Sequence, residues 1–282
     1  MRFANIKGRA SLIVNESRAI DIEEASAGQF PADPQRIYRN WDALLAWART
    51  AAATAPWFTF AAEDLENPVP SPSQVLAIGL NYRAHAEESG FAIPTSPTVF
   101  TKFPSSLAGP NAVVTLPADG HTDWEVELVA VIGKEASNVP EVDAWKYVAG
   151  LTVGQDISER ITQAAGPAPQ FSLGKSFANF GPLGPWVVTP DEFENPDDLE
   201  LGCSINGQEM QKSRTSDLVF SVPELIAQLS AVLTLKPGDV IFTGTPAGVG
   251  LGRKPQVWLQ PGDELLSWIT GLGSIRQVMV GS

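Results

Sequence analysis

The sequence has 282 residues, with 44% hydrophobic and 18% charged side chains, a net charge of −13 and a pI near 4.6. This length and balance predict a globular protein with a sizeable core and exclude a disordered chain. The acidity argues against nonspecific nucleic-acid binding, which needs a basic patch. We interpret the acidic excess first as an aid to solubility and second as carboxylates gathered for a cation.

The chain carries no sign of export or membrane insertion. Its N-terminus lacks a long apolar segment before a cleavage site, and no stretch approaches the ~20 apolar residues of a membrane helix. The single cysteine, Cys203, cannot form an internal disulfide. We therefore expect a cytoplasmic protein with neither a nucleic-acid nor a membrane partner.

Residues 1–70 are predicted to form a small separate α/β domain. Short β-like runs occur at Arg9–Val14 and Ala19–Ile22, and Ile37–Ala53 has apolar residues at helical spacing. The Pro- and Ser-rich segment Glu66–Gln74 is typical of a linker. We place a domain boundary there, so that residues 71–282 form the second domain.

The second domain is predicted to be mainly β. The apolar run Val75–Asn81, which ends in Leu and Asn after a Gly, predicts a buried strand, and many short β-like runs punctuated by Gly and Pro follow it. One clear helix is predicted at Val222–Leu233, with Ser221 as its N-cap. Because strands and helices do not alternate, a doubly wound parallel sheet is disfavoured and a barrel or folded sheet roll is favoured.

Two carboxylates open the apolar strand Asp123–Gly133. Since side chains alternate along a strand, Glu125 and Glu127 share one face, roughly 7 Å apart along the backbone. Such a pair is costly to bury unless one carboxyl is protonated, a cation lies between them or the face is wet, and for an isolated pair the wet face is the most common case. Asp156 ends another apolar run, and an Asp at a strand end often only forms a turn or caps a helix. The three oxygen donors together nevertheless suit a hard divalent cation.

The region from Val75 to about Arg276 resembles the fumarylacetoacetate hydrolase family. Each matching segment is only moderately specific, but six in this order are not expected by chance. The segments are Gly79–Glu88, Thr98–Pro110, Asp123–Ala136, Gly154–Gln163, Gly174–Val188 and Leu235–Gly250. The resemblance implies an α+β, mainly β, fold built on a mixed β-sheet roll, with the small N-terminal domain that many bacterial members carry, a homodimer, and a bound Mg²⁺ or Mn²⁺ ion.

The resemblance also implies roles for individual residues. The family's metal ligands map onto the three carboxylates Glu125, Glu127 and Asp156. The His–Glu pair of hydrolytic members maps onto His85 and Glu88, whose spacing puts them on one face of a helix. A carboxylate beside an imidazole suits a base that activates water, although such a pair can also be an idle surface feature.

Further positions match the family's substrate-binding machinery. Lys175 matches its active-site lysine, which could stabilise a developing enolate or oxyanion. Arg160 offers a fork for a substrate carboxylate, and Gln163 could bind the same ligand. The turn Gly244–Gly250 lacks the ending of a phosphate-binding loop and is expected to present Thr245 to the substrate. The full set of expected substrate contacts is Tyr82, Lys102, Arg160, Gln163 and Thr245.

These assignments imply a metal-dependent hydrolase that cleaves a C–C bond of a 1,3-diketone or acylpyruvate-type 2-oxo acid through a metal-bound enolate. The bacterial members acting on 2,4-diketo-3-deoxy sugar acids or related acylpyruvates look most similar. The apolar, Pro-rich stretch Ala164–Ser172 suits a less polar tail than a sugar acid. The same metal site could instead decarboxylate oxaloacetate or isomerise a 2-hydroxy-diene-dioate, and a non-catalytic dimeric scaffold is a more distant alternative.

Overall fold

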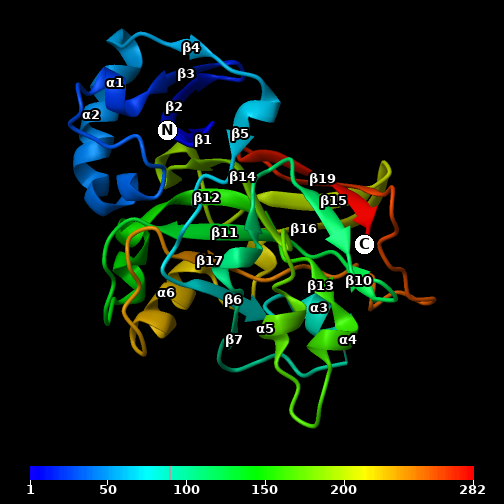
Figure 1. The fold of residues 1–282 in the computed structure, drawn as a ribbon. Coiled ribbons are helices and arrows are strands. Elements are labelled where there is room, and N and C mark those ends of the chain that lie inside the picture. The colour runs from blue at the N-terminus through cyan, green and yellow to red at the C-terminus, as the bar shows by residue number, and fades with distance from the viewer. Residues whose placement is uncertain (89) are drawn as a thin grey trace.

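The computed structural model describes residues 1–88 and 90–282 and contains one large mixed sheet (Figure 1). The strands of this sheet are β1 (Arg2–Ile6), β2 (Arg9–Asn15), β3 (Arg18–Asp21), β4 (Phe58–Thr59), β5 (Leu65–Glu66), β6 (Val75–Gly79), β7 (Thr98–Thr101), β8 (Leu107–Ala108), β11 (Val126–Ile132), β12 (Val148–Gln155), β14 (Gly181–Val188) and β17 (Val240–Phe242). Their order is β4-β3-β2-β1-β14-β12-β11-β17-β6-β7, with β5 on β1 and β8 on β14. Most neighbours are antiparallel, whereas β17 pairs with β6 in parallel.

A second sheet packs beside the first. Its order is β16-β15-β18-β19-β9, and a short β10–β13 pair lies apart from it. These strands are β9 (Val113–Leu116), β10 (Thr122–Asp123), β13 (Ser158–Glu159), β15 (Glu200–Ile205), β16 (Gln208–Arg214), β18 (Glu264–Ile269) and β19 (Gly273–Gly281). The mixed sheets confirm the predicted α+β, mainly β, class with a mixed sheet roll.

Short helices decorate the sheets. The α-helices are α1 (Ile22–Ala25), α2 (Trp41–Thr54), α3 (Arg83–Glu88), α4 (Arg160–Gln163), α5 (Phe171–Gly174) and α6 (Val222–Ser230). The 3₁₀ segments are η1 (Arg36–Asn40), η2 (Ala62–Asp64), η3 (Pro104–Ser106), η4 (Glu141–Tyr147), η5 (Pro190–Glu192) and η6 (Thr215–Asp217). Figure 1 shows α1 and α2 at one end of the molecule and α3, α4 and α5 gathered at the other. Over the described residues, no helix has the length and apolarity needed to cross a membrane.

The central strand β11 is buried on both faces, which explains its near-continuous apolar sequence. Leu128 and Ala130 point into one core cluster, and Val129 and Val131 into the other. Glu127 shares the face of Val129 and Val131 but lies at the beginning of the strand. Alternation sets the face of this carboxylate, and its place near the beginning of β11 puts it at the end of the sheet where α3, α4 and α5 gather.

The N-terminal region extends the large sheet. β1, which the sequence patterns did not predict, pairs with β14 through Arg2↔Val188 and Phe3↔Val187. The structure thus joins residues 1–70 to the rest of the chain by backbone hydrogen bonds, and the division at residue 70 stays a prediction.

Several predicted element ends were wrong by a few residues. The single helix predicted over Ile37–Ala53 is a 3₁₀ segment followed by α2, because Asn40 leaves the helical region at φ −132° and interrupts the helix. The helix that begins at Val222 ends at Ser230 rather than Leu233. Its predicted cap is confirmed, since the Ser221 hydroxyl accepts from the Glu224 N–H while the Glu224 carboxylate accepts from the Ser221 N–H.

Candidate active site

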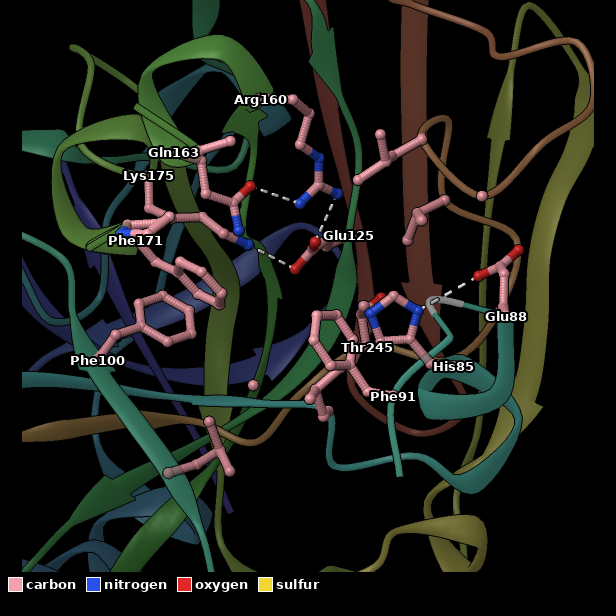
Figure 2. A pocket seen from close by; sticks show the side chains of 18 of the residues that line it. His85, Glu88, Phe91, Phe100, Glu125, Arg160, Gln163, Phe171, Lys175 and Thr245 are labelled. Atoms are coloured by element: carbon pink, nitrogen blue, oxygen red, sulfur yellow. Dashed lines mark hydrogen bonds and ion pairs between the residues drawn. The ribbon is translucent and has the colours of Figure 1, made fainter. Parts of the chain in front are cut away.

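A cavity of about 670 Å³ opens among α3, α4, α5 and the loop that follows β17 (Figure 2). Many of the predicted site residues line it together, although they come from segments far apart in the sequence. They are His85, Glu88, Glu125, Arg160, Gln163, Lys175 and Thr245. The convergence of acid, base and amide groups in one concave site makes this cavity the candidate active site.

Three buried carboxylates meet at the inner end of the cavity, which forms its floor, and of these Glu125 lines the cavity. Each of Glu125, Glu127 and Asp156 offers an oxygen, and these oxygens all lie within 4.8 Å of one another. Strand pairing brings them together, because Val126 of β11 is in register with Gln155 of β12 and the Asp156 N–H donates to the Glu125 carbonyl at 2.9 Å. The structure thus brings the three carboxylates together, and the group could hold a metal ion.

Buried cations neutralise part of this charge. The Lys175 ammonium donates to Glu125 at 2.6 Å and to Asp156 at 2.7 Å, and the Arg160 guanidinium donates to Glu125 at 2.6 Å. Burial opposes ionisation of Glu125, but the positive charges of Lys175 and Arg160 outweigh it and lower the pKa of this carboxyl to about 2. Glu125 is therefore held as a carboxylate.

Glu127 has a different environment from its neighbour. It accepts a hydrogen bond from the Gly244 N–H at 2.7 Å. Burial, together with the negative charges of Asp156 and Glu125, raises the pKa of Glu127 well above its ordinary value. A divalent cation among the three oxygens would offset both the cost of burying the Glu127 carboxylate and its repulsion by Asp156 and Glu125. The donor set and its charge therefore fit Mg²⁺ or Mn²⁺.

The Arg160 guanidinium is held in place by three side chains of the protein. In addition to Glu125, its guanidinium donates to Asp123 at 2.7 Å and to Gln163 at 2.8 Å. The sequence patterns did not identify Asp123, although it lies two residues before Glu125. This fully buried carboxylate also accepts from the Leu251 N–H at 2.7 Å, so it connects Arg160 to the loop that follows β17.

The His–Glu pair lies on the short helix α3, as predicted. Nδ1 of His85 is 3.3 Å from Oε2 of Glu88, and both residues line the cavity (Figure 2). The Gly248 N–H donates to both Glu88 oxygens, at 3.1 and 3.2 Å. Gly248 has a φ of +106°, a conformation that favours glycine. The loop thus fixes Glu88, and Glu88 in turn orients the imidazole.

Thr245 is held by a residue of the other sheet. Its hydroxyl donates to the Val126 carbonyl at 3.0 Å and accepts from the Gln211 amide at 2.8 Å. The Gln211 carbonyl oxygen also accepts from the Val126 N–H at 3.0 Å. Because its hydroxyl proton is committed, Thr245 offers a substrate an acceptor on that oxygen. Gln211 lies in the mostly polar strand β16, whose sequence carries no signal of a site.

Two expected substrate contacts lie outside the lining of the cavity. Tyr82 is only 1% exposed and forms a β-bridge with Leu218. Lys102 is also buried, and its ammonium donates to Asp156 at 2.7 Å and to the Lys175 carbonyl. Lys102 therefore contacts Asp156 and does not line the cavity.

Fold and site together define an enzyme with a mixed β-roll and a buried carboxylate trio. A sequence profile described as fumarylacetoacetate (FAA) hydrolase C-terminal matches residues 74–280. The chain therefore belongs to the fumarylacetoacetate hydrolase family, as the ordered motifs predicted.

Several proteins with stated activities are similar to this chain. The 2,4-didehydro-3-deoxy-L-rhamnonate hydrolase of Sphingomonas sp. (strain SKA58) is 47% identical over 212 residues, covering 74% of each chain. The mitochondrial oxaloacetate tautomerase Fahd2a of Rattus norvegicus is 41% identical over 247 residues, covering 87% of this chain and 79% of the relative. The maleylpyruvate hydrolase of Sphingobium sp. SYK-6, solved in complex with manganese(II) and pyruvate, is 30% identical with a TM-score of 0.83 and full coverage of both chains.

Proposed function

We propose that this enzyme is a divalent-metal-dependent hydrolase that cleaves a C–C bond of acylpyruvate-type 2,4-dioxo acids. The observation that carries the proposal is that the His85–Glu88 pair lines the same cavity as Glu125 and Lys175. A base for water, a cation for developing negative charge and a carboxylate trio are the groups that such a cleavage needs. The 47% identical rhamnonate hydrolase supports this choice of reaction.

The three carboxylates Glu125, Glu127 and Asp156 are proposed to hold Mg²⁺ or Mn²⁺. Their mutual proximity and burial suit a divalent cation, which prefers oxygen ligands. The manganese in the similar maleylpyruvate hydrolase supports the assignment. Such an ion supplies Lewis acidity toward the oxygens of a 2-oxo acid.

The other side chains of the cavity are proposed to bind the substrate, to stabilise negative charge and to transfer protons. Arg160 and Gln163 bind the carboxylate of the pyruvyl end, and Lys175 stabilises negative charge on an oxygen as it develops. His85 accepts a proton from water while Glu88 stabilises the imidazolium. Water adds to the C4 carbonyl, the C3–C4 bond breaks with its electron pair on C3, and a proton returned to C3 gives pyruvate and a carboxylic acid.

Oxaloacetate tautomerisation is a second candidate, favoured by the tautomerase that is 41% identical over 247 residues. This reaction, like the decarboxylation and isomerisation considered from the sequence, needs enolate stabilisation but no attack by water. It would use the carboxylate trio and Lys175, with His85 moving a proton between carbon and oxygen. The two candidates therefore differ in what they require of the His–Glu pair.

A small panel of substrates tests the proposal. Enzyme loaded with Mg²⁺ or Mn²⁺ is assayed with acetylpyruvate and oxaloacetate, and loss of the enol-diketone absorbance is followed together with pyruvate release. We expect His85→Ala to lower acetylpyruvate cleavage by about 10²–10⁴-fold, and Glu125→Ala to abolish turnover of every substrate. His121→Ala is the matched control. The ring of this second histidine stacks on that of Trp258, with centroids 4.7 Å apart, and it does not line the cavity. Cleavage by His85→Ala at the wild-type rate would remove the pair from the mechanism.

A further inference from the structure

The outer part of the cavity differs in chemistry from its floor. Aromatic rings line it from two sides, with Phe100 and Phe171 on one side and Phe91 on the other (Figure 2). The rings of Phe100 and Phe171 meet edge to face, with centroids 5.6 Å apart. Such a pair presents a stable apolar wall, because the edge-to-face contact holds both rings in place.

This wall begins directly where the polar floor ends. The Phe100 ring centroid lies 5.2 Å from the Lys175 ammonium, which itself donates to Glu125 and Asp156. A substrate whose dioxo acid end occupies the floor therefore extends its acyl group along Phe100 and Phe171. The cavity of about 670 Å³ is within the range that holds drug-sized ligands, and it exceeds what a four-carbon acid needs.

Phe91 faces the cavity with much of its ring in water. It is 59% exposed, and Leu251, which also lines the cavity, is 42% exposed. Large exposed apolar side chains around a concave site indicate an apolar ligand, because burial of their surface contributes to binding. An acyl group placed between Phe91 and the Phe100–Phe171 pair would cover apolar surface on both sides.

The cavity offers no free cation to a second carboxylate. Among the described residues that line it, the cationic groups are Arg160, Lys175 and, when protonated, His85. Arg160 already donates to Asp123 and Glu125, and Lys175 to Glu125 and Asp156. These same groups must also serve the carboxylate at the pyruvyl end. A charged tail would lie against aromatic rings without a cationic partner, whereas an apolar acyl group would gain from covering those rings.

We infer that the enzyme selects acylpyruvates whose acyl group is uncharged and apolar, for example one with a phenyl ring. The inference rests on the proposed function and names the substrate class of the same site. It separates this chain from hydrolases of substrates with a second carboxylate, and it agrees with the apolar character of residues 164–172.

A pair of substrates that differ by one carboxylate tests the inference. Metal-loaded enzyme is given benzoylpyruvate and 4-carboxybenzoylpyruvate, with acetylpyruvate as the common reference. We expect kcat/KM for benzoylpyruvate to exceed that for the carboxylated compound by about tenfold to a hundredfold. Equal values, or a preference for the carboxylated compound, overturn the inference even if acetylpyruvate is cleaved.

Failure of the proposed function gives a different pattern. If none of the three compounds is cleaved, the hydrolase assignment fails, and calorimetric binding of the two aromatic compounds still decides the character of the tail site. Tighter binding of benzoylpyruvate then supports an apolar tail site, and tighter binding of 4-carboxybenzoylpyruvate overturns it.

Substitution of Phe91 locates the selectivity. Since Phe91 is largely exposed, Phe91→Arg should fold normally and supply the missing cation. We expect it to lower the ratio of benzoylpyruvate to 4-carboxybenzoylpyruvate turnover by about tenfold, whereas the apolar Phe91→Leu keeps most of the ratio. Trp57→Ala removes a 49% exposed ring that does not line the cavity, and it controls for loss of a surface aromatic. An unchanged ratio in Phe91→Arg overturns the placement of the tail.

Discussion

In the N-terminal region Arg9 pairs with Asp21 near the surface, whereas in the cavity Lys175 pairs with Glu125 and Asp156 away from water. The Arg9 side chain is 40% exposed, and the Lys175 side chain is 2% exposed. Exposed pairs are weak and screened by salt, while burial of several charges is costly unless they are fully paired. The surface pair therefore contributes little to stability, whereas the buried group is costly to form and belongs to the candidate active site. Four substitutions test this difference.

The largest effect is expected for Glu127→Gln. The amide keeps an acceptor for the Gly244 N–H and removes a negative charge from beside Glu125 and Asp156. Activity should fall by roughly 10³-fold or more because a proposed metal ligand is weakened. The metal-free protein should keep or gain stability, and added Mn²⁺ should no longer raise its melting temperature as we expect it to do for wild type. Thermal unfolding with and without Mn²⁺ measures this, and a metal-free variant clearly less stable than wild type would contradict the comparison.

Asp123→Asn is expected to have the next largest effect. It removes one of the two carboxylate charges that pair with Arg160 inside the protein, and the free energy of unfolding should fall by up to about 3–5 kcal/mol, the cost of breaking a buried pair. KM should rise as well, because Arg160 loses one of the groups that orient it. Denaturant unfolding and steady-state kinetics measure the two effects. Asp198→Asn, which breaks the exposed pair with Arg214, is the matched control and should change little.

Gly252→Ala tests the positioning of Glu88. A Cβ at residue 252 would meet the Glu88 carboxyl group, a flexible side-chain end that can move aside. Displacement of Glu88 should lower kcat by about tenfold, which is less than the roughly 10²–10⁴-fold effect of removing the base, while the melting temperature changes little. Gly281→Ala, where a Cβ meets only ordinary contacts with Pro261, is the control. A Gly252→Ala enzyme with full kcat would show that Glu88 need not be held in this place.

The smallest effect is expected for Arg9→Met, below about 1 kcal/mol at pH 7. Partial burial opposes ionisation of Asp21, but hydrogen bonds from Arg9 and from the Glu24 N–H lower its pKa below the ordinary value of 3.8. A lowered folded-state pKa stabilises the protein above that ordinary value, and the stabilisation is lost as the pH falls through the folded-state pKa. The difference in unfolding free energy between wild type and Arg9→Met should therefore shrink on acidification and in high salt. A larger difference than for Asp123→Asn would reverse the comparison.

Much of the local structure follows from residue patterns that act over short distances. The apolar run that begins at Val126 predicts a buried strand, because backbone hydrogen bonds and apolar side chains are satisfied together in a sheet interior. The Ser221 cap and the His85–Glu88 spacing likewise depend only on residues within one helical turn. Strand β1 was missed because its pairing partner β14 lies elsewhere in the chain.

The site divides along the same line. Chain order and alternation predicted that Glu125 and Glu127 share a face and that Asp156 lies at a strand end, and the structure has Asp156 directly after β12. The ordered motifs determined the family. Only the tertiary structure decided that Asp123 pairs with Arg160 and that Lys102 pairs with Asp156. It also decided that Gln211 of the second sheet donates to Thr245 and that Tyr82 lies outside the lining of the cavity. Those contacts join residues far apart in the sequence, so their geometry depends on strand order and sheet packing, which no local pattern specifies.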